Sequence, residues 1–314
     1  MRKALKILRK IIRKGLGISN DFAIIEKEIH EAKVLSARVL MNQMKSQDFN
    51  GNLQDAEFKV FSQFGDDGII WYLVDHLKIE AKTFIEFGVH NYVESNTRFL
   101  LINNRWKGLV IDGSKENVDC IRNDRIYWEY DLTAVCAFVD KENINRIFVE
   151  NNVSGEIGVL SIDIDGNDYW IWEAIDVVDP VLVIVEYNSK FGNVDAIVVP
   201  YDPNFVRSQA HYSYLYGGAS LKALCFLAEK KGYAFVGSNR AGNNAYFVKK
   251  DNIGNLKQLS AQEGFVKSQF RESRDRKGRL SHVSGNEAMK MIEDMPVYDV
   301  ERGIISEIGE LLEK

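Results

Sequence analysis

Four short apolar runs that end at or just before an acid constrain this sequence more than any other feature. They occupy residues 83–87, 108–111, 158–164 and 181–186, and stretches with helical spacing separate them. Short apolar runs alternating with helices are typical of a parallel sheet buried on both faces. We therefore predict an α/β fold with a doubly wound, mostly parallel, Rossmann-like sheet.

The last two apolar runs predict a different connection. Residues 233–237 and 244–249 are joined by the turn 238–242, which is too short for a crossover helix. They should pair as an antiparallel terminal hairpin. With a short strand around Asp131, the sheet reaches seven strands.

The N-terminal 50 residues are predicted to be a helical extension. Residues 1–17 carry seven Lys and Arg and no acid, with leucines and isoleucines at helical spacing. Such a helix either lies on an anionic membrane surface or docks on its own domain or a sister chain, which leaves a homo-oligomer open. A second helix is expected over 20–44, with a buried stripe of Phe22, Ile25, Ile29, Ala32, Val39 and Leu40.

The main domain is expected over 51–258, with 259–314 forming a flap and closing helices. A net charge of -5 gives no reason to expect nucleic acid as a partner. Three scattered cysteines form no CxxC, which favours a reducing, cytoplasmic location. Nothing in the sequence has the length of a transmembrane span.

The first crevice segment follows residues 83–87. In open α/β sheets, ligands bind beyond the carboxyl ends of the strands. Glu86 can accept from an ammonium group, and Gly88 allows a close backbone approach. The next helix is expected over 94–104, and the residues that open it point its free amides at the ligand: Ser95, Asn96 and Thr97.

Two further strand ends offer acids to a nucleoside. Asp112, followed by Gly113 and Ser114, lies 24 residues after Gly88, close to the spacing of a ribose-binding acid. Asp131 is expected to accept from an adenine amino group.

Residues 160–169 and 185–188 hold the densest acids. Alternation places Asp163 and Asp165 on one face of a strand, and Glu186 and Asn188 should reach the same edge. Either a magnesium ion joins Asp165, Glu186 and Asn188, or Asp163 and Asp168 cap the next helix.

Two other segments are candidates for roles around this crevice. His211, in a long polar loop, is a candidate general base, as is Asp163; a hydrogen-bonded loop residue is the plainer interpretation of His211. The glycine- and acid-rich segment 61–68 either caps a helix through Asp66 or forms a lid. The sequence contains no GxxxxGK[ST], HExxH or GxSxG motif.

Taken together, SQFGDDGII, FIEFGVHNYVESNTRFLL, VIDGS, LSIDIDGNDYWIW and VIVEYN resemble the FkbM-like class I methyltransferases, in a branch associated with bacterial surface polysaccharides. The resemblance covers roughly residues 58–250. It implies S-adenosylmethionine (SAM) as cofactor, a sugar or glycan hydroxyl as acceptor, and roles for Glu86, Gly88, Asp112, Asp131 and Asp163 at the cofactor. It also matches Glu186 and Asn188 to metal-holding positions. Val93, Glu94 and Ser95 replace the usual second glycine of the cofactor loop.

Two alternatives remain open at this point. A nicotinamide-dependent oxidoreductase uses a similar fold, although an antiparallel last strand fits it less well. A non-catalytic, membrane-associated scaffold would depend on residues 1–17 rather than on Asp112.

Overall fold

The computed structural model describes residues 18–45, 47, 49 and 52–312. The chain divides into two compact units, residues 1–47 and residues 48–314, and each is described by itself. The basic segment 1–17 lies outside the described residues.

The first unit contains the long helix α2, Ile18–Met44. The stripe predicted to be buried is wrong, because the five members whose side chains are described are exposed: Ile25, Ile29, Ala32, Val39 and Leu40. Val34 and Ala37 are buried instead. The helix carries apolar residues on two faces, so periodicity alone cannot select the buried one.

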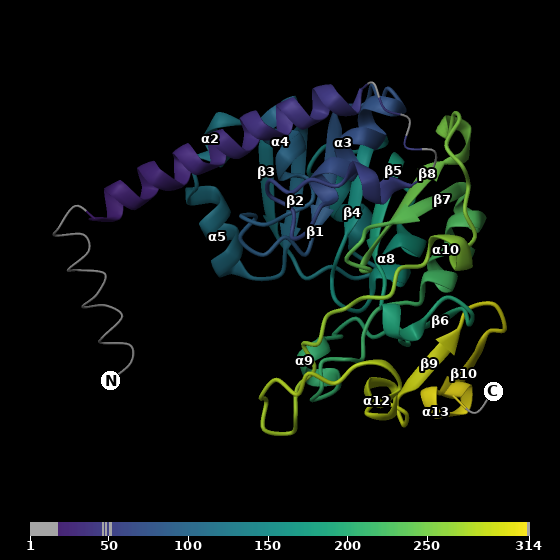
Figure 1. Cartoon of the computed structure of the whole chain (residues 1–314). Helices are drawn as coiled ribbons and strands as arrows, with labels where there is room; N and C mark the ends of the chain where they lie inside the picture. The colour runs from purple at the N-terminus through teal and green to yellow at the C-terminus, as the bar shows by residue number, and fades with distance from the viewer. Residues whose placement is uncertain (1–17, 46, 48, 50–51, 313–314) are drawn as a thin grey trace. The chain divides into compact units, whose positions relative to one another are not determined.

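The second unit is built on a seven-stranded sheet in the order β3-β2-β1-β4-β5-β8-β7 (Figure 1). The predicted fold is confirmed: all neighbours pair in parallel except β8, which runs antiparallel to both β5 and β7. The hairpin therefore returns its second strand into the sheet, between β5 and β7. The strands are β1 Thr83–Phe87, β2 Lys107–Asp112, β3 Leu132–Cys136, β4 Gly155–Ile162, β5 Val178–Glu186, β7 Tyr233–Ser238 and β8 Asn244–Lys249.

Helices cover the sheet because its strands are apolar on both sides. Ile85 and Phe87 of β1 pack in a large core with Trp172 and Leu224, while Phe84, on the opposite side of the strand, is also fully buried. The larger helices of this unit are α3 Asp66–His76, α4 Arg98–Asn104, α5 Lys115–Asn123, α7 Ile144–Glu150, α8 Asp168–Ala174 and α10 Leu221–Lys231. The helix predicted over 94–104 begins later than expected, at Arg98.

A small antiparallel sheet, β10-β9-β6, lies below the large one in Figure 1. Its strands are β6 Ile197–Val198, β9 Pro296–Asp299 and β10 Ile304–Glu307. With the short helices α9 Arg207–Ala210, α12 Gly285–Lys290 and α13 Ile308–Leu312 it surrounds a second core that includes Phe191, Leu215 and Ile292. The segment 259–314, expected to form a flap and closing helices, contains the strands β9 and β10 as well as short helices.

Within the described residues, no helix has both the length and the apolar character to cross a bilayer.

Candidate functional site

The turn between β1 and α4 is organised around Glu86. Its carboxylate accepts from the Ser95 hydroxyl at 2.7 Å, the Asn96 amide at 2.9 Å, and the Thr97 amide and hydroxyl at 3.0 and 2.5 Å. Asn96 also donates through Nδ2 to Ser161 of β4 at 3.1 Å. Burial raises the pKa of Glu86, and these donors oppose the rise. The predicted ammonium contact is not supported, since Glu86 is occupied in holding the turn.

Gly88 fits this turn for a reason that the sequence did not show. Its φ is +79°, and a Cβ there would lie 1.5 Å from the carbonyl oxygen of Asp163. The close approach is thus to the loop after β4. His90 and Tyr92 also have positive φ, at 48° and 59°, so the turn follows a strained path without the second glycine.

Asp112, at the end of β2, uses one of its two carboxylate oxygens in hydrogen bonds. Its Oδ1 accepts from the Ser114 amide at 2.8 Å and from Asn117 Nδ2 at 2.9 Å, while Ser114 caps α5. Among the described residues Oδ2 has no hydrogen-bond partner. Gly88 donates to the Ile111 carbonyl at 3.0 Å, so the turn and Asp112 meet at one edge of the sheet.

The prediction for Asp131 is wrong. Asp131 precedes β3, and its carbonyl accepts from Gly108 at the start of β2, so it lies at the opposite end from Asp112. The carboxyl end of β3 leads instead to Ala137, whose amide donates to the Asp112 carbonyl at 3.0 Å. Phe138 follows and is 52% exposed. Placing the strand at 130–132 rather than 132–136 hid this residue.

The acids after β4 lie in a loop, not on one strand face as predicted. β4 ends at Ile162, and Asp165 adopts a φ of 62°. Asp168, the first residue of α8, accepts from the loop amides of Ile164 and Gly166 at 2.8 and 2.9 Å, so it holds the loop and does not cap the helix, whose N-cap is Asn167. Burial, and then the charge of Glu186, raise the pKa of Asp168 to about 7.

Asp163 and Glu186 face the strongest electrostatic penalty. Burial is the largest cause and raises the pKa of each well above its usual value. The neighbouring charge of Asp165 adds to both shifts, and Asp163 also raises the pKa of Glu186.

Arg207 supplies the positive charge that the sequence assigned to a metal. Its guanidinium donates to Asp165 at 2.7 Å and to Glu272 at 2.5 Å. Asn188 donates both amide hydrogens, to the carbonyls of Leu215 and Gly217, and its Oδ1 accepts from the backbone. The magnesium prediction is therefore not supported: in the part of the chain that is described, no three metal-ligating acids, histidines or cysteines converge.

His211 is not brought to these acids. It ends α9, its Nδ1 lies 2.6 Å from the Ser213 hydroxyl, and Asp294 and Arg276 are the charges that act on it. Burial lowers its pKa. The plainer interpretation, a hydrogen-bonded loop residue, accounts for these contacts.

A narrow cavity of about 40 Å³ lies where β5 ends. Segment 266–272, which we call the strap, closes one side: Tyr187 donates through its hydroxyl to the Val266 carbonyl at 2.6 Å, and Ser268 donates to the Ser189 hydroxyl at 3.0 Å. Phe270 stacks on Phe64, with ring centroids 4.9 Å apart. The lining residues are Asp165, Glu186, Tyr187, Asn188, Ser189, Lys190, Arg207, Gly217, Gly218, Gly242, Asn243, Ser268, Phe270 and Glu272.

Sequence reasoning missed Lys190, Arg207 and Glu272 at this cavity. The basic, polar character of 260–280 indicated a flap, which was the only signal for Glu272. Nothing in the local sequence distinguishes Lys190 from a surface lysine.

Segment 61–68 does not act as a lid, because its acids are buried. Asp67 Oδ2 accepts from the amides of Val60, Phe61 and Ser62 at 2.7–2.8 Å, and burial raises its pKa to about 6. Asp66 accepts from the Tyr246 hydroxyl at 2.6 Å. Phe64 does not line the cavity but stacks on Phe270, which does.

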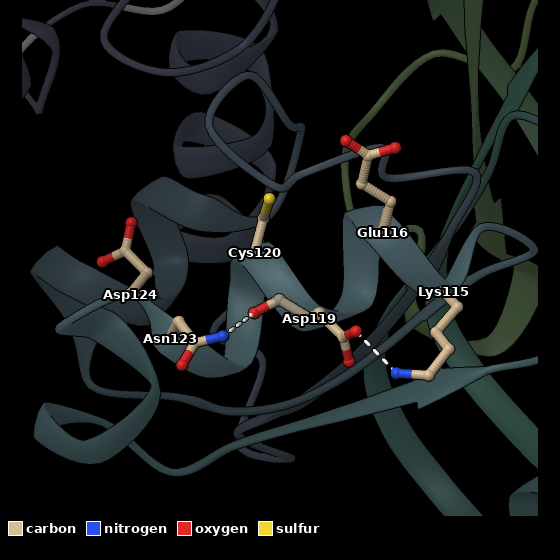
Figure 2. A pocket seen from close by; sticks show the side chains of 6 residues that line it. All are labelled: Lys115, Glu116, Asp119, Cys120, Asn123 and Asp124. Atoms are coloured by element: carbon tan, nitrogen blue, oxygen red, sulfur yellow. Dashed lines mark hydrogen bonds and ion pairs between the residues drawn. The ribbon is translucent and has the colours of Figure 1, made fainter. Parts of the chain in front are cut away.

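A second depression, wide and open, lies along α5 (Figure 2). Lys115 pairs with Asp119 at 2.6 Å, and Asn123 donates to the Asp119 carbonyl, so both interactions stay within the helix. It holds none of the residues that line the strap cavity.

No family model and no curated protein matches the sequence. Similar solved structures include an O-methyltransferase from Bacillus cereus in complex with SAH, at 14% identity over 71% of this chain and 91% of that chain, with a TM-score of 0.41. Another is the N-terminal domain of EvdMO1 with SAH bound, at 11% identity over 60% and 80%, with a TM-score of 0.39. Similarity this low carries no weight for function.

Proposed function

We propose that this protein is a SAM-dependent O-methyltransferase that acts on a hydroxyl of a sugar or glycan intermediate in surface-polysaccharide biosynthesis. One observation carries the proposal. The Gly88 turn, Asp112 and exposed Phe138 lie at the ends of three adjacent strands, and one carboxylate oxygen of Asp112 has no partner in the described part of the chain. The sequence resemblance described above supports the same assignment.

An adenosyl group fits these residues. Asp112 Oδ2 can accept from a ribose hydroxyl, and Phe138 offers an apolar face for an adenine ring. Gly113 permits this arrangement, since a Cβ there would lie 3.2 Å from the Phe138 ring. When bound, the cofactor supplies a methyl group on an already activated sulfonium. The protein then has to hold the acceptor hydroxyl in line and take its proton.

Calorimetric titration with SAM tests the assignment. Wild-type protein should bind SAM and not NAD, and Asp112→Ala should weaken SAM binding about tenfold or more, because a charge-assisted hydrogen bond is lost. Asp119→Asn, on the exposed side of α5, is the matched control and should bind normally. Binding of NAD in preference to SAM, or an unaffected Asp112→Ala variant, would contradict the proposal.

We also propose that residues 1–17 hold the enzyme on the inner face of an anionic membrane, beside its glycan acceptor. Co-sedimentation with phosphatidylglycerol vesicles should be lost when residues 1–17 are deleted, and retained with their sequence intact. Equal co-sedimentation of both proteins would contradict this anchor.

A further inference from the structure

The polar groups around the strap cavity differ in whether they have partners. Asp165 and Glu272 are both paired to Arg207, and Asn188 uses its whole amide on neighbouring backbone groups. The charges of Asp165 and Glu272 are thus compensated by Arg207, and the amide of Asn188 is fully used.

Glu186 and Lys190 differ from these residues. Both line the cavity, yet among the residues described neither side chain makes a hydrogen bond or an ion pair. Lys190 is largely desolvated, which lowers its pKa, and Glu186 and Glu272 are acids whose charges oppose that shift. Leaving two opposite charges unpaired in a partly buried site is costly. Such a site suits a ligand that satisfies both charges at once.

A hydroxyl group is the ligand that does so. It donates one hydrogen bond and accepts others, whereas a carboxylate would repel Glu186 and an ammonium would repel Lys190. We propose that Glu186 and Lys190 together bind the acceptor hydroxyl, which donates to the Glu186 carboxylate and accepts from the Lys190 ammonium. This inference rests on the proposed function and assigns the acceptor class as a neutral polyol.

The size of the cavity limits what enters. A water needs about 10–15 Å³, so about 40 Å³ admits one hydroxyl-bearing edge and not a whole sugar ring. The ring would remain outside, and Phe270, the aromatic residue of the strap that lines the cavity, offers it an apolar surface. The strap then covers the hydroxyl and excludes water from it.

With Glu186 and Lys190 in these roles, every bond and proton of the methyl transfer is accounted for. The oxygen–methyl bond forms as the sulfur–methyl bond of the sulfonium breaks, and the hydroxyl proton passes to the Glu186 carboxylate and then to solvent. The products are a methyl ether and a neutral thioether. Glu186 lines the cavity and has no hydrogen-bond or ion-pair partner among the described residues, so its carboxylate is available to accept the proton of a bound alcohol.

The first test measures acceptor binding without cofactor. Saturation-transfer NMR is run on the full chain with methyl glycosides of neutral hexoses and 6-deoxyhexoses, and with methyl glucuronoside and methyl glucosaminide as charged comparators. At least one neutral glycoside should bind more tightly than both charged ones, and Glu186→Gln and Lys190→Met should each weaken it about tenfold. Glu229→Gln and Lys222→Met, both away from the cavity, are the matched controls. Tighter binding of a charged glycoside, or unchanged binding by the two variants, would overturn the proposal that Glu186 and Lys190 bind the acceptor hydroxyl.

The second test measures SAH release with the same glycosides and SAM. Glu186→Gln should lower kcat about 100-fold or more with SAM affinity unchanged, while Lys190→Met should mainly raise KM for the glycoside. A Glu186→Gln variant that retains kcat within threefold would overturn the role of Glu186 as general base. Failure of wild-type protein to bind SAM would instead contradict the proposed function, and the NMR result would still decide the pair.

Discussion

Glu86 and Glu186 lie near the carboxyl ends of β1 and β5 in one sheet, and burial raises the pKa of both. Glu86 accepts four hydrogen bonds from its own turn, whereas Glu186 has none among the residues described. The carboxylate in the turn 86–98 therefore has all its partners within that turn, whereas the carboxylate of Glu186 in the strap cavity lacks partners among the described residues. An acid at a strand end indicates a functional role only when its partners leave it free.

The largest effect should come from Gly88→Ala in the satisfied turn. The new Cβ meets the Asp163 carbonyl at 1.5 Å and must adopt a φ of +79°, so we expect a loss of about 3 kcal/mol or more in the free energy of unfolding. Urea denaturation measures it. Gly155→Ala, with φ +71° and open space around it, should cost only about 1–2 kcal/mol. Equal losses for the two variants would show that the turn does not depend on this close approach.

The acids around the cavity should make stability depend on pH. The pKa of Asp168 rises from 3.8 to about 7 on folding, so the folded state holds a proton that the unfolded state releases between these values. This group should therefore lower stability as pH rises from about 4 to 7, by at most about 4 kcal/mol, and its contribution should be constant above pH 7. Asp168→Asn should make that decline shallower.

Urea midpoints between pH 4.5 and 8 check this dependence, with Asp119→Asn expected to match the wild type. Stability that rises over this range in the wild type would contradict the assignment of a buried, proton-binding Asp168.

Replacing Glu86 and Glu186 with glutamine, one at a time, should affect stability differently. Glu86→Gln places an NH₂ group against donors of the turn and should cost about 1–3 kcal/mol. Glu186→Gln loses no hydrogen bond and relieves repulsion from Asp163, so its stability should be unchanged or higher. Thermal and urea unfolding of both variants measure the contrast, which would be broken by equal destabilisation.

The smallest effect should come from Phe64→Ala. Its stacking on Phe270 is worth about 0.5–1.5 kcal/mol beyond the area that it buries. We expect a modest stability loss together with faster protease cleavage in the strap, 266–272. Unchanged cleavage would indicate that the hydrogen bonds from Tyr187 and Ser268 hold the strap without the aromatic pair.

Much of the sheet was predictable from the sequence, because buried strands and helices have different periodicities. The runs at 83–87 and 244–249 became β1 and β8 at those positions. Asp131 was misplaced because Thr133 and Cys136 weaken the apolar pattern of β3, and boundaries are least certain in such short strands. The closing helices expected within 259–314 are interrupted by β10, because the isoleucines at 304 and 305 also suit a strand.

The sequence by itself determined the sheet, its antiparallel return, and the set of acids that follow its strands, since these depend on local patterns along the chain. The tertiary structure alone decided which of these acids have hydrogen-bond or ion-pair partners. Glu86 accepts hydrogen bonds from residues 9–11 positions later in the chain. Asp165 instead pairs with Arg207, 42 positions away, and Arg207 pairs with Glu272, a further 65 positions along. Whether a charge has a partner depends on distances in space, and no local pattern records distances of that kind.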